Sequence, residues 1–210
     1  MSPHSPTAAP SPLLLIGTPE PLTEVVHARL SDDGHGVLRL DTCAPHAVAE
    51  RLLGLNGLAA LVLMTPTALS HRRFEDITDA DFETALEQQL FSVVRVVQQV
   101  LPHLSSGAQI VHVGSRGHLG AWGGVHQMAA SAALAAMSRS MALELQAEGI
   151  SVNLVAAEFA HERQDSPENR GAVAHAVSLF AAPTNRITGQ HLVIDGLSSL
   201  RMSEARRHRF

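Results

Sequence analysis

The sequence predicts a doubly wound α/β fold, a mostly parallel sheet with helices on both faces. Short apolar runs recur along the chain, as expected for strands that are buried on both sides. Segments with apolar residues at helical spacing lie between these runs. Strands that alternate with amphipathic helices favour a parallel sheet, whose ligands bind beyond the carboxyl ends of the strands.

The first half of the chain contains three predicted strands separated by two predicted helices. Glycines follow the first strand and the first helix, and a proline suits the first turn of each helix. The expected elements are the strand 13–16, a helix from Pro21, the strand 36–40, a helix from Pro45 and the strand 58–64.

The second half begins with the clearest helical pattern, over residues 78–104. Thr78 can cap this helix, with Asp81 three residues later, and the apolar positions keep a period close to 3.6 residues. The remaining expected elements are the strand 109–113, an Ala-rich helix 126–147, the strand 151–156, a short helix 172–180 and the strand 190–194.

The 210 residues suit one domain. Residues 1–12 are rich in Pro and Ser and are expected to form a disordered leader. The folded domain is expected over 13–197, and residues 198–210 form a polar, Arg-rich tail. The apolar run 13–16 is too short for a signal peptide or a membrane span, so we expect no membrane partner.

Composition excludes several classes of chemistry. The formal net charge is -5 with scattered arginines, which argues against a nucleic-acid partner. The chain contains no Tyr, and all 15 of its basic residues are Arg, so it supplies no phenol and no side-chain amine. Cys43 is the sole cysteine, which rules out an intrachain disulfide and a cysteine metal cluster and fits a cytoplasmic location.

Four segments and one helix resemble the short-chain dehydrogenase/reductase family. The resemblance covers most of the chain after Leu58 and includes the helix 78–104, which ends in VLPHL. The four segments are IVHVGS at 110–115, ASAAL…SRSMALEL at 130–145, ISVNLV at 150–155 and ITGQHLVIDG at 187–196. Only about twenty residues separate Asp41 from the strand around Leu61, so one strand–helix unit of the family pattern is expected to be missing.

The resemblance implies a nicotinamide cofactor, but the residues after the first strand argue against one. The family's TGxxxGxG turn lets a pyrophosphate approach bare backbone at a helix N-terminus. Here only Gly17 of that pattern is present, and Pro21 and Thr23 stand where the second and third glycines would be. Glu20 adds a negative charge near the expected phosphates. We therefore expect no cofactor.

The resemblance also implies a catalytic set of Asn, Ser, Tyr and Lys. Ser115 alone keeps its identity. Alignment on the SRSMALEL segment puts Gln127 at the Tyr position and Ser131 at the Lys position, and Gln89 falls where the family has Asn. The loop between Ser115 and Gln127 is one residue short, so His126 is an alternative occupant of the Tyr space.

These changes favour a cofactor-independent acid–base enzyme of the cyclase, dehydratase or isomerase type, acting on a small apolar or polyketide-like substrate. A His with a pKa near neutrality beside a Ser or a carboxylate can move protons. The candidate catalytic residues are Ser115, His118, His126, Gln127 and Glu158.

Met64 and Trp122 are candidates for the apolar floor of this substrate pocket. The chain has 13 histidines, so any single His in these loops has an ordinary structural explanation as well. No ligand spacing supports a metal site among His118, His126 and His161.

Two alternatives remain open. The first is a catalytically inactive subunit that forms a homodimer or a higher oligomer, or pairs with an intact relative. Its interface would be the helices 78–104 and 126–147, since the alanines of the second helix permit close approach. The second alternative is an atypical NAD(P)-dependent oxidoreductase.

Overall fold

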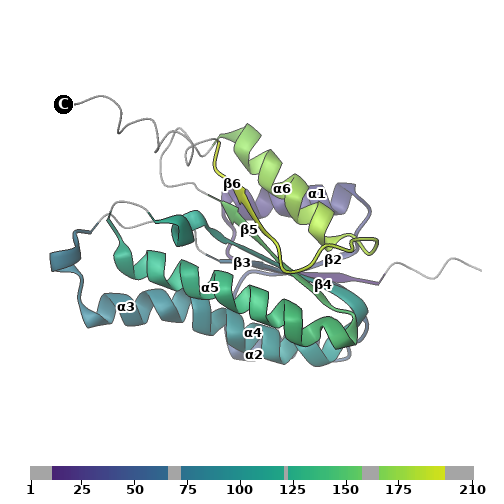
Figure 1. Cartoon of the computed structure of the whole chain (residues 1–210). Helices are drawn as coiled ribbons and strands as arrows, with labels where there is room; N and C mark the ends of the chain where they lie inside the picture. The colour runs from purple at the N-terminus through teal and green to yellow at the C-terminus, as the bar shows by residue number, and fades with distance from the viewer. Residues whose placement is uncertain (1–10, 66–71, 121–122, 158–165, 197–210) are drawn as a thin grey trace, which may run out of the picture.

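The computed structural model describes residues 11–65, 72–120, 123–157 and 166–196. Within them, six strands form one parallel sheet in the order β2-β1-β3-β4-β5-β6 (Figure 1). The strands are β1 (Leu13–Ile16), β2 (Val37–Leu40), β3 (Leu58–Met64), β4 (Leu104–Ser115), β5 (Ser151–Ala157) and β6 (His191–Ile194). The predicted parallel α/β fold is confirmed. The expected leader and tail lie outside the described residues, apart from positions 11 and 12.

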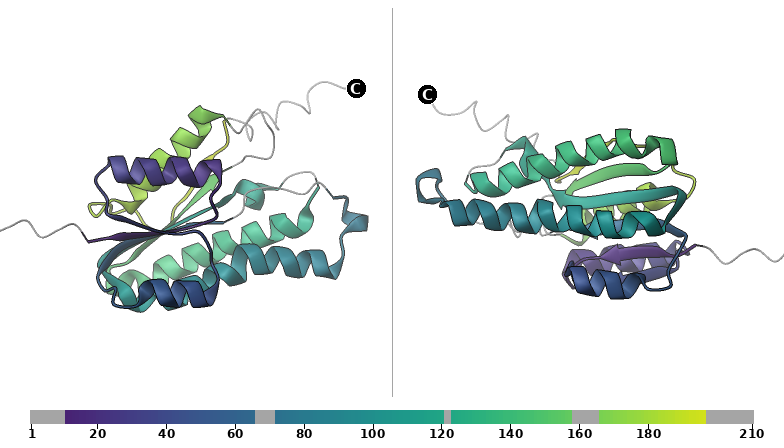
Figure 2. Two further views of the ribbon diagram at one scale, coloured as in Figure 1. Left: turned by 180° about the vertical axis from the view of Figure 1, so that it is seen from behind. Right: turned by 90° about the horizontal axis from the view of Figure 1, so that it is seen from below.

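Helices cover both faces of the sheet (Figures 1 and 2). One face is covered by α1 (Pro21–Asp32) and α6 (Pro167–Ala181), and the other by α2 (Pro45–Leu52), α4 (Ser92–Val100) and α5 (Val125–Glu144). A further helix, α3 (Asp79–Leu86), precedes α4. No helix in the described ranges is both long enough and apolar enough to cross a membrane.

The strand residues contribute to two separate hydrophobic cores, because successive side chains point to opposite faces of the sheet. In β1, Leu14 and Ile16 pack with α2 and α4, whereas Leu13 and Leu15 pack with α1 and α6. All four side chains are fully buried. Burial on both faces explains why these strands are continuous apolar runs in the sequence.

A single helix lies between β2 and β3, as the short sequence spacing predicts. Only α2 and short connections separate β2 from β3, and β2 forms one edge of the sheet. All four residues of β2 are half-buried, unlike the buried residues of β1. The shortened fold therefore leaves the end of β2 at an edge that is partly open to solvent.

The predicted helix 78–104 is present as an uninterrupted helical segment that contains a π-helical turn. Its N-terminal capping box is present: the backbone N–H of Thr78 donates to Asp81 Oδ2 at 2.9 Å, and the backbone N–H of Asp81 donates to Thr78 Oγ1 at 3.3 Å. A π-helical turn, η2 (Glu87–Phe91), then separates α3 from α4, and the 3-10 turn η3 (Leu101–His103) follows. The period remains helical, so the apolar pattern could not reveal the π-helical turn.

Two other boundaries differ from the prediction. Strand β4 begins at Leu104 instead of 109, and α6 spans Pro167–Ala181 instead of 172–180. Ser166 caps α6 by accepting a hydrogen bond from the backbone N–H of Asn169, and Pro167 occupies the first turn. The polar first turn of α6 hid its start, because it lacks the apolar periodicity of the rest.

Candidate functional site

The candidate residues gather at the carboxyl edge of the sheet. The last residue of β4, Ser115, pairs with Ala157, the last residue of β5. Next to them, Thr65 follows β3 and donates from its hydroxyl to the carbonyl of Val113 at 2.8 Å. This edge is where a doubly wound sheet binds its ligands.

Ser115 is held by its own loop. Its Oγ accepts a hydrogen bond from the backbone N–H of Gly117 at 3.1 Å and so caps the short turn η4 (Arg116–Leu119). A Cβ at Gly117 would lie 2.9 Å from Met128 Cε and 3.0 Å from Ser131 Oγ. The loop after Ser115 therefore packs directly on α5 and leaves no room for a side chain at Gly117.

Ser131 and Gln89 occupy the positions that correspond to Lys and Asn of the family, and they are hydrogen-bonded to each other. The Ser131 hydroxyl lies 3.0 Å from Gln89 Oε1 and 2.9 Å from the carbonyl of Gln127. Ser131 and Gln89 are 2% and 4% exposed. The hydroxyl proton of Ser131 and the amide oxygen of Gln89 are thus both engaged in hydrogen bonds within the protein.

The π-helical turn η2 explains how Gln89 reaches Ser131. An extra residue in a helical turn rotates the side chains that follow it relative to a regular helix, and such turns are frequent at functional sites. Gln89 belongs to η2 and is buried against α5. Sequence alignment placed Gln89 near the site, but the direct bond to Ser131 depends on this π-helical turn.

His126 lies in the interface between α5 and α3. Its ring centroid is 6.0 Å from that of Phe82, in an edge-to-face arrangement at 67°. The side chain is 5% exposed, and its Nδ1 has no hydrogen-bond partner in the described part of the chain. Among the described residues, no hydrogen bond joins His126 to Ser115.

Two of the remaining candidates, His118 and Gln127, lie on η4, which Ser115 caps, and on α5, which carries His126. His118 is half-buried in η4, and its ring centroid is 5.9 Å from that of His191 in β6. Burial lowers the pKa of His118, a hydrogen bond with the backbone of Ser115 raises it, and the positive charge of Arg116 lowers it; the net shift is downward. Gln127 is half-buried on α5, and its backbone carbonyl is the second acceptor for Ser131. Glu158, His161 and Trp122 lie outside the described residues.

Met64, the predicted pocket floor, packs against the first glycine. It is buried at the end of β3, and a Cβ at Gly17 would lie 2.5 Å from Met64 Cβ. Gly17 is therefore required by the close approach of the chain after β1 to Met64 at the end of β3, which is a structural reason independent of any nucleotide.

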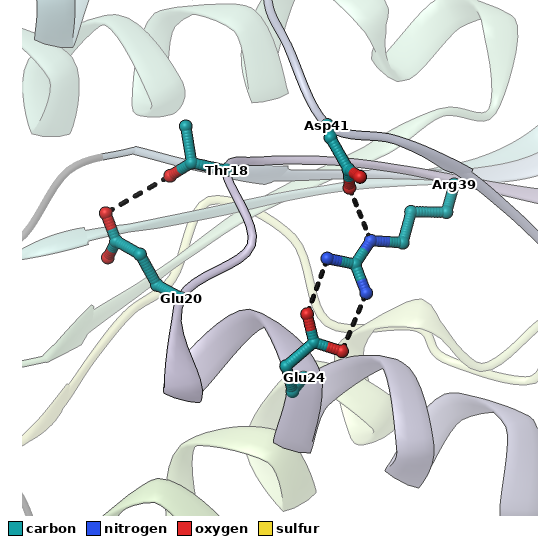
Figure 3. Close-up of polar contacts among 5 residues, drawn as sticks. All are labelled: Thr18, Glu20, Glu24, Arg39 and Asp41. Carbon is teal, nitrogen blue, oxygen red and sulfur yellow. Dashed lines mark hydrogen bonds and ion pairs between the residues drawn. The ribbon is translucent and has the colours of Figure 1, made fainter.

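The turn after β1 does not fit a dinucleotide pyrophosphate. Glu20 is the residue before α1, and its carboxylate accepts a hydrogen bond from Thr18 Oγ1 at 3.1 Å (Figure 3). The positive end of a helix favours an anion, and here the protein places a carboxylate beside it. Pro21 removes a backbone donor from the first turn, and Thr23 is buried where the family has glycine.

A second feature of this region is an ion-pair cluster that the sequence did not reveal. Arg39 in β2 binds Glu24 of α1 through two hydrogen bonds of 2.6 and 2.8 Å and binds Asp41 through a third of 2.6 Å (Figure 3). The hydrogen bond from Arg39 lowers the pKa of Glu24, and the bond to Glu24 raises that of Arg39. Asp41 directly follows β2, so the carboxylate at the end of that strand is already hydrogen-bonded to Arg39.

A buried ion pair links the ends of two strands. Arg116, directly after β4, lies 3.7 Å from Asp195, directly after β6, and both side chains are 7% exposed. The strand between them is β5, so this pair bridges the carboxyl edge of the sheet. Among the described residues, no group of three or more His, Cys, Asp or Glu side chains could hold a metal ion.

In the described part of the chain, the helical layers carry at least two hollows. A groove of about 320 Å³ runs between α4 and α5, and another of about 370 Å³ lies between the ends of α1 and α6. The first is mostly apolar and is lined by Val94, Val97, Gln98, Leu101, Met137, Ser140, Met141, Glu144 and Leu145.

Comparison with known proteins agrees with this architecture. The family model described as Enoyl-(Acyl carrier protein) reductase matches residues 42–171, more than half of the chain. No curated protein matches the chain.

Among solved structures, a short-chain dehydrogenase family protein from Francisella tularensis is 17% identical, with a TM-score of 0.74, 91% of this chain covered and 100% of that one. An oxidoreductase of the family from Burkholderia thailandensis is 18% identical, with a TM-score of 0.77, 96% of this chain covered and 99% of that one. A family member from Serratia marcescens is 20% identical, with a TM-score of 0.74, 89% of this chain covered and 96% of that one. The chain therefore belongs to the short-chain dehydrogenase/reductase family.

Proposed function

We propose that this chain is an assembly subunit built on the short-chain dehydrogenase/reductase fold and that it performs no nicotinamide-dependent redox reaction. The observation that carries the proposal is the buried hydrogen bond between Ser131 and Gln89. A reductase of this family would use these two positions to serve a proton donor. Here they satisfy each other, and the chain has no Tyr and no Lys to supply that donor.

The nucleotide-binding end supports the same proposal. The dinucleotide would bring two phosphates to the turn that carries Glu20 and Pro21, where it would meet a carboxylate and one backbone donor fewer. Its ribose would approach Asp41, which Arg39 already binds. Both features disfavour binding of the dinucleotide, since the turn would meet its phosphates and Asp41 would meet its ribose.

The surface of α4 and α5 supports the assembly role. The two helices lie side by side over one face of the sheet (Figures 1 and 2). Their groove is apolar, and large apolar side chains remain exposed beside it: Phe91 is 47% exposed and Leu143 is 73% exposed. Exposed apolar surface of this kind is typical of an interaction site.

A second copy of the chain is the occupant that suits this groove. Three exposed alanines of α5, at positions 129, 132 and 136, allow a neighbouring helix to approach closely. Arg95 on α4 and Glu144 on α5 carry opposite charges, so a two-fold axis can bring Arg95 of one copy toward Glu144 of the other. We therefore expect a homodimer through α4 and α5.

Sedimentation equilibrium tests the assembly role directly. We expect a dimer for the wild-type protein and a monomer for Met137→Glu, because the substitution places a charge in the apolar groove. The matched control is Leu179→Glu, which alters an exposed apolar residue of α6 on the opposite layer. A monomeric wild-type protein, or a Met137→Glu variant that remains dimeric, would contradict the proposal.

A second candidate function is cofactor-independent acid–base catalysis. It is supported by the unpartnered Nδ1 of His126, a buried group able to exchange a proton. The test is deuterium exchange in D₂O at carbons next to the carbonyl of small ketones and hydroxyacyl thioesters, followed by NMR. Exchange that requires the wild-type protein and disappears in His126→Gln would establish this function in place of the first.

A further inference from the structure

The cavity of about 370 Å³ between the ends of α1 and α6 is lined by charged as well as apolar side chains. The two helices pack side by side on one face of the sheet, whereas α4 and α5 cover the other face (Figures 1 and 2). Because α1 precedes β2 and α6 precedes β6, these helix ends lie where strands begin. The cavity is therefore at the opposite edge of the sheet from Ser115.

Asp33 directly follows α1 and connects the two helices at the cavity wall. Its Oδ2 accepts a hydrogen bond from Arg29 Nε at 2.7 Å and another from the hydroxyl of Ser178 in α6. The bonds from Ser178 and then Arg29 lower the pKa of Asp33 more than burial raises it. The side chains of Arg29 and Asp33 remain 41% and 31% exposed. Two opposite charges are thus held in contact where a ligand can reach them.

Both charged groups keep hydrogen-bonding capacity that the described residues do not use. Arg29 is bound through Nε alone, so its Nη1 and Nη2 groups remain available together. A guanidinium binds a carboxylate through two such parallel bonds. Within the described ranges, Asp33 Oδ1 accepts no hydrogen bond, and a carboxylate oxygen is an acceptor for an ammonium group.

The cavity favours a positive group as well as a negative one. Asp33 and Ala182 line it, and they are the residues directly after α1 and α6. The C-terminal end of a helix carries a partial negative charge, which favours a cation. An anion alone would meet these helix ends and the Asp33 carboxylate, and a cation alone would meet the guanidinium of Arg29. A zwitterion satisfies both charges.

A metal ion is a poorer match for this cavity. His35 and His175 line it together with Asp33. However, no three His, Cys, Asp or Glu side chains in the described part of the chain are arranged so that they could hold a metal ion. The two imidazoles are instead available as additional hydrogen-bonding groups for a polar organic ligand.

The spacing of the charges and the rest of the wall define the ligand further. Because Arg29 Nε and Asp33 Oδ2 are only 2.7 Å apart, the two charges of the ligand must also lie close together. A single carbon separates them in an α-amino acid. Leu179, which is 51% exposed, and Pro183 supply an apolar wall. We infer that this cavity binds an α-amino acid with an aliphatic side chain, its carboxylate on Arg29 and its ammonium on Asp33.

An NMR titration of the isotope-labelled protein with L-leucine tests the site. We expect saturable shifts of amide signals at the ends of α1 and α6, with a dissociation constant of about 1 mM, as suits a ligand of this size. Isocaproate lacks the ammonium, isoamylamine lacks the carboxylate, and ε-aminocaproate is an isomer of leucine whose charges lie far apart. Each of the three should bind about tenfold more weakly than leucine or worse.

Arg29→Gln and Asp33→Asn should each weaken leucine binding about tenfold or more, because each removes a charge-assisted hydrogen bond. Arg29 is half-exposed, and Asn at position 33 keeps an oxygen for Ser178, so both variants should fold. The matched controls are Arg51→Gln on α2 and Asp32→Asn, which alters the exposed neighbour of Asp33. They should bind leucine as the wild-type protein does.

Three results would overturn the inference: no binding of leucine to the wild-type protein, equally tight binding of isocaproate or isoamylamine, or an affinity for leucine that survives both substitutions. The cavity lies apart from the groove of α4 and α5, so none of these results depends on the oligomeric state.

Discussion

At the scale of single residues, the buried His112 makes the stability of the protein depend on pH. It is fully buried in β4, and its Nδ1 lies 2.6 Å from Ser138 Oγ, whose own proton goes to the carbonyl of Leu134. His112 therefore donates from Nδ1, and its Nε2 has no partner in the described part of the chain. Burial lowers its pKa from 6.5 to about 4. The neutral ring is the form that this core accepts.

The lowered pKa predicts a loss of stability in mild acid. The unfolded chain binds a proton at His112 near pH 6.5, whereas the folded chain does so only near pH 4. The free energy of unfolding should therefore fall by about 3 kcal/mol as the pH falls through this window. Urea titrations at several pH values measure this slope. His112→Gln should reduce it, and His46→Gln should not; equal slopes in the three proteins would contradict the assignment.

The hydrogen bond between Ser131 and Gln89 makes a second prediction at this scale. Ser131→Ala leaves Gln89 Oε1 buried without its donor, which should lower the free energy of unfolding by about 1–3 kcal/mol. Ser140→Ala is the matched control, because Ser140 is an exposed serine of the same helix. Denaturant unfolding of both variants decides: if Ser131→Ala costs no more than Ser140→Ala, the bond contributes little in solution.

At the scale of elements, the close approach of the chain after β1 to the end of β3 depends on Gly17. A Cβ at this position would lie 2.5 Å from Met64 Cβ and 2.9 Å from Met64 Cγ, so Gly17→Ala should destabilise the protein by about 1–3 kcal/mol. The Met64→Gly substitution removes both obstructing atoms, whereas Met64→Ala would keep Cβ. A double-mutant cycle should therefore show coupling, with Gly17→Ala costing less in the Met64→Gly background. Purely additive effects would show that Gly17 is needed for another reason.

Local signals let the sequence predict most elements, and long-range contacts account for what it missed. Thr78 and Asp81 lie three residues apart, so their capping box was readable, and so were the apolar strands. The bond between Ser131 and Gln89 spans 42 residues, and the pair Arg39–Glu24 spans 15. No periodicity encodes such contacts. Alignment placed Ser115 and His126 near one site, but the contact with Phe82 that holds His126 arises only from packing.

At the scale of the whole molecule, assembly through α4 and α5 should couple stability to protein concentration. If only the folded chain dimerises, the melting temperature rises as the concentration increases. We expect this rise for the wild-type protein and for Leu179→Glu, and a constant melting temperature for Met137→Glu. Differential scanning calorimetry over a wide concentration range provides the measurement. A wild-type melting temperature that does not depend on concentration would argue against the dimer.

Our proposal that this chain performs no nicotinamide-dependent reaction rests on the reaction centre and on the nucleotide-binding turn. The parallel sheet and the helices on both of its faces agree with the family's fold. The changes fall at the turn of Glu20 and Pro21, at the Arg39 cluster and at Ser131 with Gln89. We therefore propose a family member that has kept the fold without the family's nicotinamide-dependent chemistry.

Calorimetric titration of the wild-type protein with NADH and with NADPH tests that claim most directly. The carboxylate of Glu20 beside α1 and the internal pairing of Asp41 predict no measurable binding of either nucleotide. Saturable binding of NADH or NADPH with a dissociation constant in the micromolar range would contradict it.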